Sequence, residues 1–466
     1  MRISTKRFLT TLLTIGVTCA TLITNLAGTS QARSTSPHFA FDAALAQSKV
    51  LQGASGNISV ALTLNGSELV GPTNEAIQPV DLIVVLDCSG SMSGQKIADA
   101  RNGVLQLINY MGRDDRMGII TYSNGVEMLS PLVGLSGGQR EHMSALIRQV
   151  RVGGGTNLGG GLQMGINTLM QRDISHRQRK VMLISDGLAN QGITSPRDLG
   201  QMAARATEWG VSVSTVGVGY DFNELLMTTI ADYGAGNYYF LENPQAFAEV
   251  FKKEFEATRN VVAGNAELRI PLAHGVQLID AGGYPIKTVG NVAVIRLGDL
   301  LAGQQRKIYL TYRIPTNRLQ SYELGDMKIN YRHNDEELQV AGGQRFKIDC
   351  VEDKKAVVAS IDKEVWSEQV VKEDFSKLKD TVANAVRSGK KQEALEAIEE
   401  YETKTGELND SVGSAEVSRN LESDLAPLRQ SVEQTFTGAP AAVAEKRKQQ
   451  AKELQYESYK VRRDKR

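Results

Sequence analysis

The feature of this sequence that most constrains its fold is an alternation, between residues 79 and 260, of short apolar runs with segments of helical periodicity. None of the runs contains a charged residue, which predicts strands buried on both faces, as in a parallel sheet. The runs occupy residues 82–86, 118–122, 181–184 and 211–218. Because such strands alternate with helical segments, we expect an α/β domain with a doubly wound, mostly parallel, Rossmann-like sheet and right-handed crossovers.

Helical signals fill the segments between these runs. Apolar residues recur at helical spacing between residues 97 and 111. Ser195 followed by Pro196 predicts a capped helix start, and Asn243 followed by Pro244 predicts the start of a last helix over residues 244–258. We therefore expect the α/β domain to occupy residues 79–260.

The segments on both sides of this domain follow a different pattern. After residue 264 a period of two returns, with Pro, Gly and polar turns between the runs, so residues 261–350 are predicted to form a β-sandwich. Residues 58–64 also alternate and lead into Asn65-Gly66, a strong hairpin signal. Because an isolated hairpin is marginal, we expect segment 56–78 to pair with the later sandwich, in which the α/β domain would then be an insertion.

Amino-acid composition indicates the structural class of three further segments. Residues 33–55 are rich in Ser, Ala and Gln without a strong period, and are predicted to be a linker or a short helix. Residues 351–435 are rich in Ala, Glu, Lys and Leu and are predicted to form a C-terminal helical module. Residues 436–466 are predicted to be a basic tail, since nine basic residues stand against three acidic ones after residue 445. Such a tail is typical of a solvated helix or disordered end, or of a contact for anionic lipid or an acidic partner.

The N-terminus has the pattern of an export signal. Basic residues precede an apolar, Thr-rich run over residues 8–27, and a small-residue site follows at residues 30–32. We expect residues 1–32 to be a cleaved signal peptide and the protein to be exported to a periplasmic or extracellular location. An uncleaved membrane anchor is the alternative, because the run is nearly long enough to span a bilayer.

Side chains with oxygen atoms stand where two predicted strands end and in a glycine-rich loop. They are Asp87, Ser89, Ser91, Thr156 and Asp186. Open α/β sheets bind ligands at the carboxyl ends of their strands, so we expect these groups to converge. Hard cations such as Mg²⁺ take oxygen ligands, and Mn²⁺ or Ca²⁺ are alternatives. Two carboxylates would neutralise the ion formally, and a carboxylate from a partner protein could complete its shell.

On these residues, the segment from 79 to 260 resembles a von Willebrand factor type A domain. The metal-ion-dependent adhesion site of that family has the pattern Asp-x-Ser-x-Ser with a distant Thr and a distant Asp, and all five positions are matched. The resemblance implies that the hydroxyl groups bind the metal directly, that the carboxylates act partly through water, and that an acidic residue of a partner binds the metal. It also implies that the last helix of the domain shifts when a ligand binds. The flanking segments are similar to those of bacterial exported proteins that carry this domain.

Other classes of function have weaker support in the sequence. Asp-x-Ser-x-Ser alone could be a helix-capping turn, but Thr156 and Asp186 favour a metal site. No Gly-Lys-Ser or Gly-Lys-Thr follows the glycines at 153–155 and 159–161, which argues against nucleotide binding. The five histidines are scattered without ligand spacing, and no base is identifiable for Cys88, Ser89 or Ser91. Since Lys and Arg number 53 and Asp and Glu number 53, no nucleic-acid partner is expected either.

We therefore predict a non-enzymatic bacterial protein for metal-dependent adhesion or scaffolding, whose partner protein offers Asp or Glu to the metal. Membrane contact could come from an uncleaved N-terminal segment or from the basic tail. The alternative is a structural subunit of an envelope assembly whose metal only stabilises the fold. A hydrolase with an unrecognised site is a third hypothesis, and the sequence does not indicate an oligomeric state.

Overall fold

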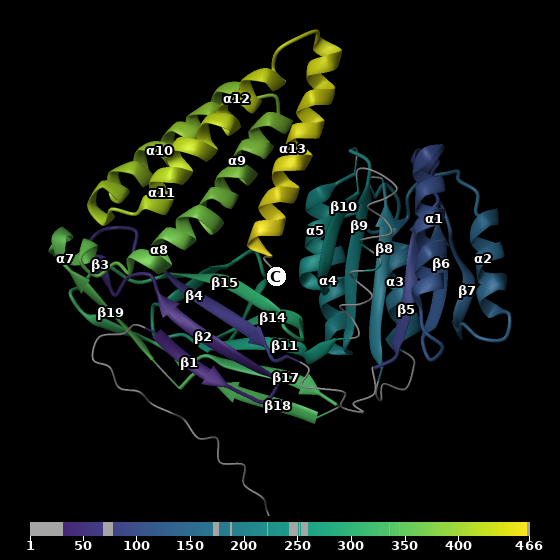
Figure 1. Cartoon of the computed structure of the whole chain (residues 1–466), viewed down its shortest axis with the longest axis horizontal. Helices are drawn as coiled ribbons and strands as arrows, with labels where there is room; N and C mark the ends of the chain where they lie inside the picture. Colours follow the sequence, from purple (N-terminus) through teal and green to yellow (C-terminus); the bar gives the residue numbers. More distant parts are fainter. Residues whose placement is uncertain are drawn as a thin grey trace, which may run out of the picture.

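The computed structural model describes residues 31–68, 78–170, 177–186, 189–220, 222–241, 260–334, 336–343 and 345–463, with positions 250 and 252. It has three parts, an α/β domain, a β-sandwich and a helical module (Figure 1). The predicted signal sequence up to residue 30 and nearly all of the predicted helix 244–258 lie outside the described residues. Within the described ranges, no helix is long and apolar enough to cross a membrane.

The α/β domain is built on a six-stranded sheet in the order β10-β9-β8-β5-β6-β7. Its strands are β5 (Val80–Asp87), β6 (Arg116–Tyr122), β7 (Val126–Gly134), β8 (Gln178–Ser185), β9 (Val211–Val218) and β10 (Ala235–Leu241). Its helices are α1 (Gln95–Tyr110), α2 (Gln139–Gln149), α3 (Leu158–Met170), α4 (Pro196–Glu208) and α5 (Glu224–Tyr233), with a 3₁₀ turn, η1 (Gly90–Met92). Only β7 is antiparallel to its neighbour among these strands, which confirms the predicted doubly wound, mostly parallel sheet.

Helices cover both faces of this sheet, so its central strand is buried throughout. Leu82 and Val84 of β5 pack in a cluster with α1 and α2, whereas Ile83 and Val85 pack with α3, α4 and α5. Each fully buried aliphatic side chain contributes about 1.5–3 kcal/mol relative to an exposed one. The unbroken apolar run of β5 thus follows from its two buried faces.

The β-sandwich combines strands from before and after the α/β domain. Its sheets have the orders β1-β2-β4-β15-β12, β13-β14-β11-β17-β18 and, in a short third sheet, β16-β19-β3. The strands before the domain are β1 (Gln31–Thr35), β2 (Phe39–Leu45), β3 (Lys49–Leu51) and β4 (Asn57–Gly66). Those after it are β11 (Val261–Pro271), β12 (Gln277–Ala281), β13 (Ile286–Val289), β14 (Val292–Leu301), β15 (Gln305–Arg313), β16 (Ser321–Leu324), β17 (Lys328–His333), β18 (Glu336–Ala341) and β19 (Phe346–Val351). Because β4 pairs antiparallel with β15 and also with β2, the α/β domain is inserted in the sandwich.

Residues 33–55 do not form the predicted linker or short helix, since they contain β2, β3 and part of β1. In β2, Phe39 and Phe41 point into the sandwich core together with Ala43 and Leu45. The period of two is present in the sequence, but Ala40 and Ala44 on the other face make it hard to recognise. Pairing with β4 supplies the hydrogen bonds that a linker would lack.

The predicted C-terminal helical module is present. Its helices are α7 (Lys354–Val358), α8 (Lys363–Gln369), α9 (Phe375–Arg387), α10 (Lys391–Val412), α11 (Ala415–Arg419), α12 (Leu425–Thr435) and α13 (Pro440–Arg462). Two π-helical turns, η2 (Val370–Asp374) and η3 (Asn420–Asp424), connect α8 to α9 and α11 to α12. An apolar core of its own holds α9, α10, α12 and α13 together.

The segment expected to be a solvated basic tail is the packed helix α13. It lies against α9 and runs toward the point where the three parts meet (Figure 1). Tyr459 joins the apolar core of the α/β domain, and Lys452 is buried with its Nζ donating to the carbonyl of Phe222 at 2.6 Å. Arg463 forms an ion pair with Asp232. Lys452 of α13 and Arg463, which directly follows it, thus find partners inside the molecule.

Candidate functional site

The five predicted oxygen side chains lie at the carboxyl edge of the central sheet. Asp87 ends β5, Asp186 follows the last residue of β8, and Thr156 lies two residues before α3. Ser89 and Ser91 lie between β5 and α1. Four of the five are buried, and Ser91 is exposed, so the group is open to solvent on that side.

Hydrogen bonds bring four of these residues together. The Oγ atoms of Ser89 and Ser91 lie 3.0 Å apart, and Ser91 Oγ donates to Asp186 Oδ1 at 2.8 Å. The amide of Ser89 donates to Asp87 Oδ1 at 2.8 Å. Two carboxylates and two hydroxyl groups from different strand ends therefore form one connected cluster.

Backbone contacts hold the loop of Thr156 against this cluster. The amide of Gly90 donates to the carbonyl of Gly154 at 3.1 Å, and the amide of Gly153 donates to the carbonyl of Cys88 at 2.9 Å. The amide of Thr156 itself donates to Asn190 Oδ1 at 2.8 Å. The glycine-rich loop is thus tied to the loop after β5 and to the loop after β8.

Asn124 also orders this loop, a role that we did not predict. Its Oδ1 accepts from the amide of Gly155 at 2.5 Å and from Gln191 Nε2 at 2.8 Å. Gly154 has φ +78°, and a Cβ atom there would lie 2.9 Å from the Asn124 side chain. The loop therefore needs glycine at 154. An amide two residues beyond the run 118–122 is the only sequence signal for Asn124, and it is weak.

The cluster concentrates negative charge in a buried place. Asp87 Oδ2 accepts from Ser185 Oγ at 2.6 Å and from Tyr122 Oη at 3.3 Å. Burial nevertheless raises the pKa of Asp87 above its usual value, and the charge of Asp186 raises it further. A nearby cation favours the charged form of such a carboxyl group. Oxygen donors of this kind fit the preferences of Mg²⁺ and related hard cations.

Lys96 is a second residue of the site that we did not predict. Its Nζ donates to Asp186 Oδ2 at 2.5 Å from the first turn of α1. Lys96 lies nine residues after Asp87 in the sequence, and nothing in this spacing indicates the contact with Asp186. The pair depends on the tertiary approach of α1 to the end of β8.

Two rival interpretations of the loop after β5 do not fit its geometry. Ser89 precedes η1 without a side-chain capping hydrogen bond, and the N-cap of α1 is Gly94, so the motif is not a helix-capping turn. Burial raises the pKa of the Cys88 thiol to about 12, which leaves it neutral and a poor nucleophile. Among the residues that the structure describes, no three His, Cys, Asp or Glu side chains are grouped as metal ligands.

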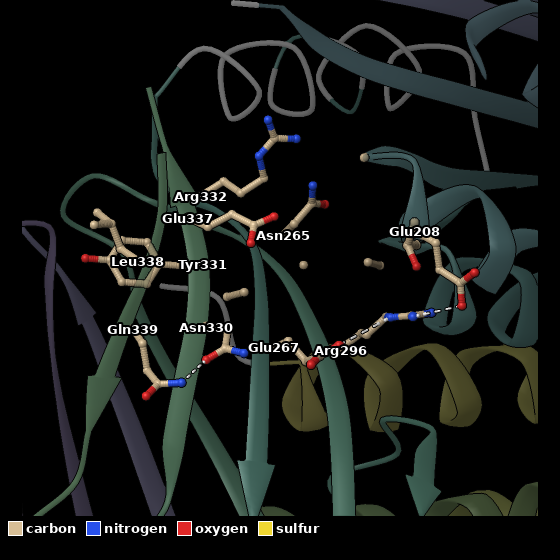
Figure 2. Close-up of a pocket in the computed structure, with 15 residues that line it drawn as sticks. Glu208, Asn265, Glu267, Arg296, Asn330, Tyr331, Arg332, Glu337, Leu338 and Gln339 are labelled. Carbon is tan, nitrogen blue, oxygen red and sulfur yellow. Dashed lines mark hydrogen bonds and ion pairs between the residues drawn. The ribbon is translucent and has the colours of Figure 1, made fainter. Parts of the chain in front are cut away.

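A cavity of about 480 Å³ lies elsewhere, where the end of α4 and Gly210, the residue before β9, meet the sandwich (Figure 2). Its lining includes Arg296, whose Nη2 is 3.1 Å from Glu208 Oε1 and whose Nε is 3.8 Å from Glu267 Oε2. Because β9 is parallel to the neighbouring strands, this cavity lies at the edge of the sheet opposite to Asp87. It is a polar seam between two domains and is separate from the oxygen cluster.

Comparisons with known proteins agree with this architecture. Residues 81–253 match the von Willebrand factor type A domain. The uncharacterized protein sll0103 of Synechocystis sp. is 26% identical over 263 residues, or 54% of this chain and 61% of that protein. The uncharacterized protein YfbK of Escherichia coli is 28% identical over 199 residues, or 42% of this chain and 34% of that protein. The matched regions thus span less than two thirds of these relatives.

A solved structure shares the fold beyond the α/β domain. It is described as von Willebrand factor type A from Catenulispora acidiphila, and it aligns with 93% of this chain and 99% of its own chain, with a TM-score of 0.65 and 17% identity. The sequence match, the sheet order and this shared fold lead to one conclusion. Residues 81–253 are a von Willebrand factor type A domain, which this chain carries as an insertion in a β-sandwich.

Proposed function

We propose that this protein binds a partner protein through a divalent cation held by Asp87, Ser89, Ser91, Thr156 and Asp186. Mg²⁺ fits such a donor set best, with Mn²⁺ or Ca²⁺ as alternatives. The hydrogen-bonded chain from Ser89 through Ser91 to Asp186, beside the buried Asp87, is the observation that supports this proposal most directly.

The chemistry of each group defines its part in binding. The hydroxyl groups of Ser89, Ser91 and Thr156 would hold the ion directly, and the carboxylates of Asp87 and Asp186 would act partly through water. When bound, the cation supplies a coordination position for an anionic ligand. An Asp or Glu side chain of a protein partner has the charge and the oxygen atoms to occupy that position.

The same residues favour adhesion or scaffolding over catalysis. Cys88 is buried and neutral, and the described hydrogen bonds of Ser89 and Ser91 involve no histidine that could act as a base. We therefore propose a non-enzymatic protein. We also propose that it is exported, because basic residues precede an apolar run at its N-terminus.

Two neighbouring serines offer a matched test of the metal site. Ser91 and Ser93 are both exposed in the same loop, but only Ser91 belongs to the proposed ligand set. In calorimetric titrations with Mn²⁺, we expect Ser91→Ala to weaken binding by about tenfold or more and Ser93→Ala to leave it unchanged. Equal affinities of Ser91→Ala and the unaltered chain would contradict the proposed site.

Capture experiments test the role of the metal in partner binding. The chain from residue 33 would be used as bait in extracts of its source, with Mg²⁺ or with EDTA. We expect captured proteins to be eluted by EDTA and to be absent with Asp87→Ala bait. If Asp87→Ala instead lowers the melting temperature but leaves capture unchanged, the metal stabilises the fold and the protein is a structural subunit of an envelope assembly.

A further inference from the structure

The ammonium group of Lys96 stands at the edge of the proposed metal site. Its Nζ donates to Asp186 Oδ2 at 2.5 Å, while Asp186 Oδ1 accepts from Ser91 Oγ at 2.8 Å. The Asp186 side chain is fully buried, whereas that of Lys96 is 30% exposed. Both oxygens of this carboxylate are therefore engaged, one by a hydroxyl group and the other by a positive charge.

The aliphatic part of Lys96 is packed as well. Gly219 directly follows β9, and a Cβ atom at Gly219 would lie only 3.1 Å from Lys96 Cε. The space left by the missing side chain at 219 is thus occupied by the methylene groups of Lys96. Packing on one side and an ion pair at the end both direct this side chain toward Asp186.

The charges of the site follow from these contacts. Asp87 and Asp186 together carry two negative charges, and Lys96 balances one of them. A divalent cation would bring the total of the three side chains and the ion to plus one. Since the ion and the ammonium group both need Asp186, each weakens the attraction of the other to this carboxylate.

We propose that Lys96 is a built-in competitor of the metal, which keeps the metal affinity of the partner-free chain low. The metal-loaded site then has one positive charge that the carboxylate of the partner balances, so metal and acidic partner bind cooperatively. This inference rests on the metal-dependent function proposed above. It differs from that function because it assigns a role to a residue outside the ligand set.

Substitutions at Lys96 separate its charge from its packing. Lys96→Met keeps an unbranched side chain beside Gly219 and removes the charge, whereas Lys96→Arg keeps the charge. Mn²⁺ titrations of the full chains would be made at the same pH. We expect Lys96→Met to bind Mn²⁺ about tenfold more tightly than the unaltered chain, because the repulsion between the ammonium group and the ion is removed. Lys96→Arg should bind like the unaltered chain. Lys96→Gln provides the same comparison if Lys96→Met does not fold.

The outcomes distinguish this inference from the proposed function. Unchanged or weaker Mn²⁺ binding by Lys96→Met, in a chain that binds Mn²⁺ before substitution, overturns the competition and leaves the metal site standing. If neither the unaltered chain nor Lys96→Met binds Mn²⁺, the metal site and the competition both fall. If Lys96→Met binds Mn²⁺ more tightly and the added Ser91→Ala substitution abolishes this gain, both the metal site and the competition by Lys96 are supported.

Discussion

Asp87 is the residue whose proposed role in metal binding costs the metal-free fold the most stability. Its carboxyl group is fully buried, and burial and the charge of Asp186 raise its pKa. A group whose folded pKa is raised contributes less stability as the pH rises through that value, because the charged form is disfavoured in the folded chain. When Asp87 is ionised, the metal-free fold bears the cost of a buried anion, which a bound cation would relieve.

Replacing Asp87 with Asn should separate these two effects. Asn keeps an oxygen that can accept from the Ser89 amide, and the hydroxyl groups of Ser185 and Tyr122 can turn to accept from its amide nitrogen. In EDTA, we expect Asp87→Asn to raise the free energy of unfolding by about 1–2 kcal/mol, because a buried charge is removed. Thermal melts should also show that Mg²⁺ no longer stabilises this variant. A variant that is less stable in EDTA and still stabilised by Mg²⁺ would contradict this expectation.

At the scale of elements, the close approach of α3 to the sheet fixes where Thr156 lies. A Cβ atom at Gly161 would be 2.7 Å from the Tyr122 ring, and one at Gly165 would be 2.8 Å from Val85 Cγ2. Glycine at both positions lets the helix axis lie close to β5 and β6. The glycine run that superficially suggests a phosphate loop is thus explained in part by helix packing.

Gly161→Ala should therefore destabilise the α/β domain. The added methyl group would overlap a buried ring and the Val85 side chain, and overpacking of this kind costs about 1–3 kcal/mol. Gly406→Ala is the control, because Gly406 also lies inside a helix but a Cβ atom there meets nothing closer than 4.0 Å. Urea unfolding should show a gain of about 0.5–1 kcal/mol for Gly406→Ala. Equal effects of the two substitutions would mean that α3 can move away from the sheet at little cost.

The elements that the sequence predicts well are those whose signal is local. The four apolar runs lie in β5, β6, β8 and β9, since strands buried on both faces need an unbroken apolar run. β2 is missed because alanines on its outer face hide the alternation. α13 is misjudged because some of its basic residues are held by distant acids or carbonyl groups, as Lys452 and Arg447 are. Lys96 and Asn124 could not be found in the same way, since their contacts depend on tertiary approach.

At the scale of the whole molecule, α13 joins the helical module to both other parts. Tyr459 Oη accepts from the amide of Tyr238 in β10 at 3.0 Å, and the guanidinium of Arg463 lies 3.3 Å from the centroid of the Tyr284 ring in the sandwich. Lys452 reaches the carbonyl of Phe222, three residues after the Gly219 that packs on Lys96. α13 thus contacts the segment after β9 that also packs on Lys96.

Tyr459→Phe tests one of these contacts without changing the ring. The amide of Tyr238 is buried and would lose its acceptor, which costs about 1–3 kcal/mol. Tyr110→Phe is the control, because Tyr110 is 46% exposed on α1. We expect denaturant unfolding to show this loss in the free energy of unfolding for Tyr459→Phe and almost no loss for Tyr110→Phe. Matching stabilities of the two variants would show that water or a shift of α13 replaces the lost hydrogen bond.

The junction beside α13 should also respond to pH through Glu224. Its side chain is buried, and its Oε2 lies 3.6 Å from both Lys452 Nζ and Arg387 Nη2. Burial raises the pKa of Glu224 from 4.5 to about 7, and Asp380 adds to this rise, although Lys452, Tyr238 and Arg387 lower it. Because the folded pKa is the higher one, the stability contributed by the neutral carboxyl group is fully present below pH 4.5 and is lost as the pH rises through about 7.

The unaltered chain should therefore lose stability between pH 5 and pH 8, by no more than about 3 kcal/mol. Glu224→Gln keeps an oxygen that accepts from Tyr238 Oη and carries no charge, so we expect it to reduce this loss. Free energies of unfolding measured in urea across this pH range would test the difference between the two chains. If the unaltered chain and Glu224→Gln lose stability in parallel, Glu224 is not the group whose titration lowers the stability. The acidic side chains of α9 then become the alternative source of the pH dependence, since burial raises the pKa of Asp380 there.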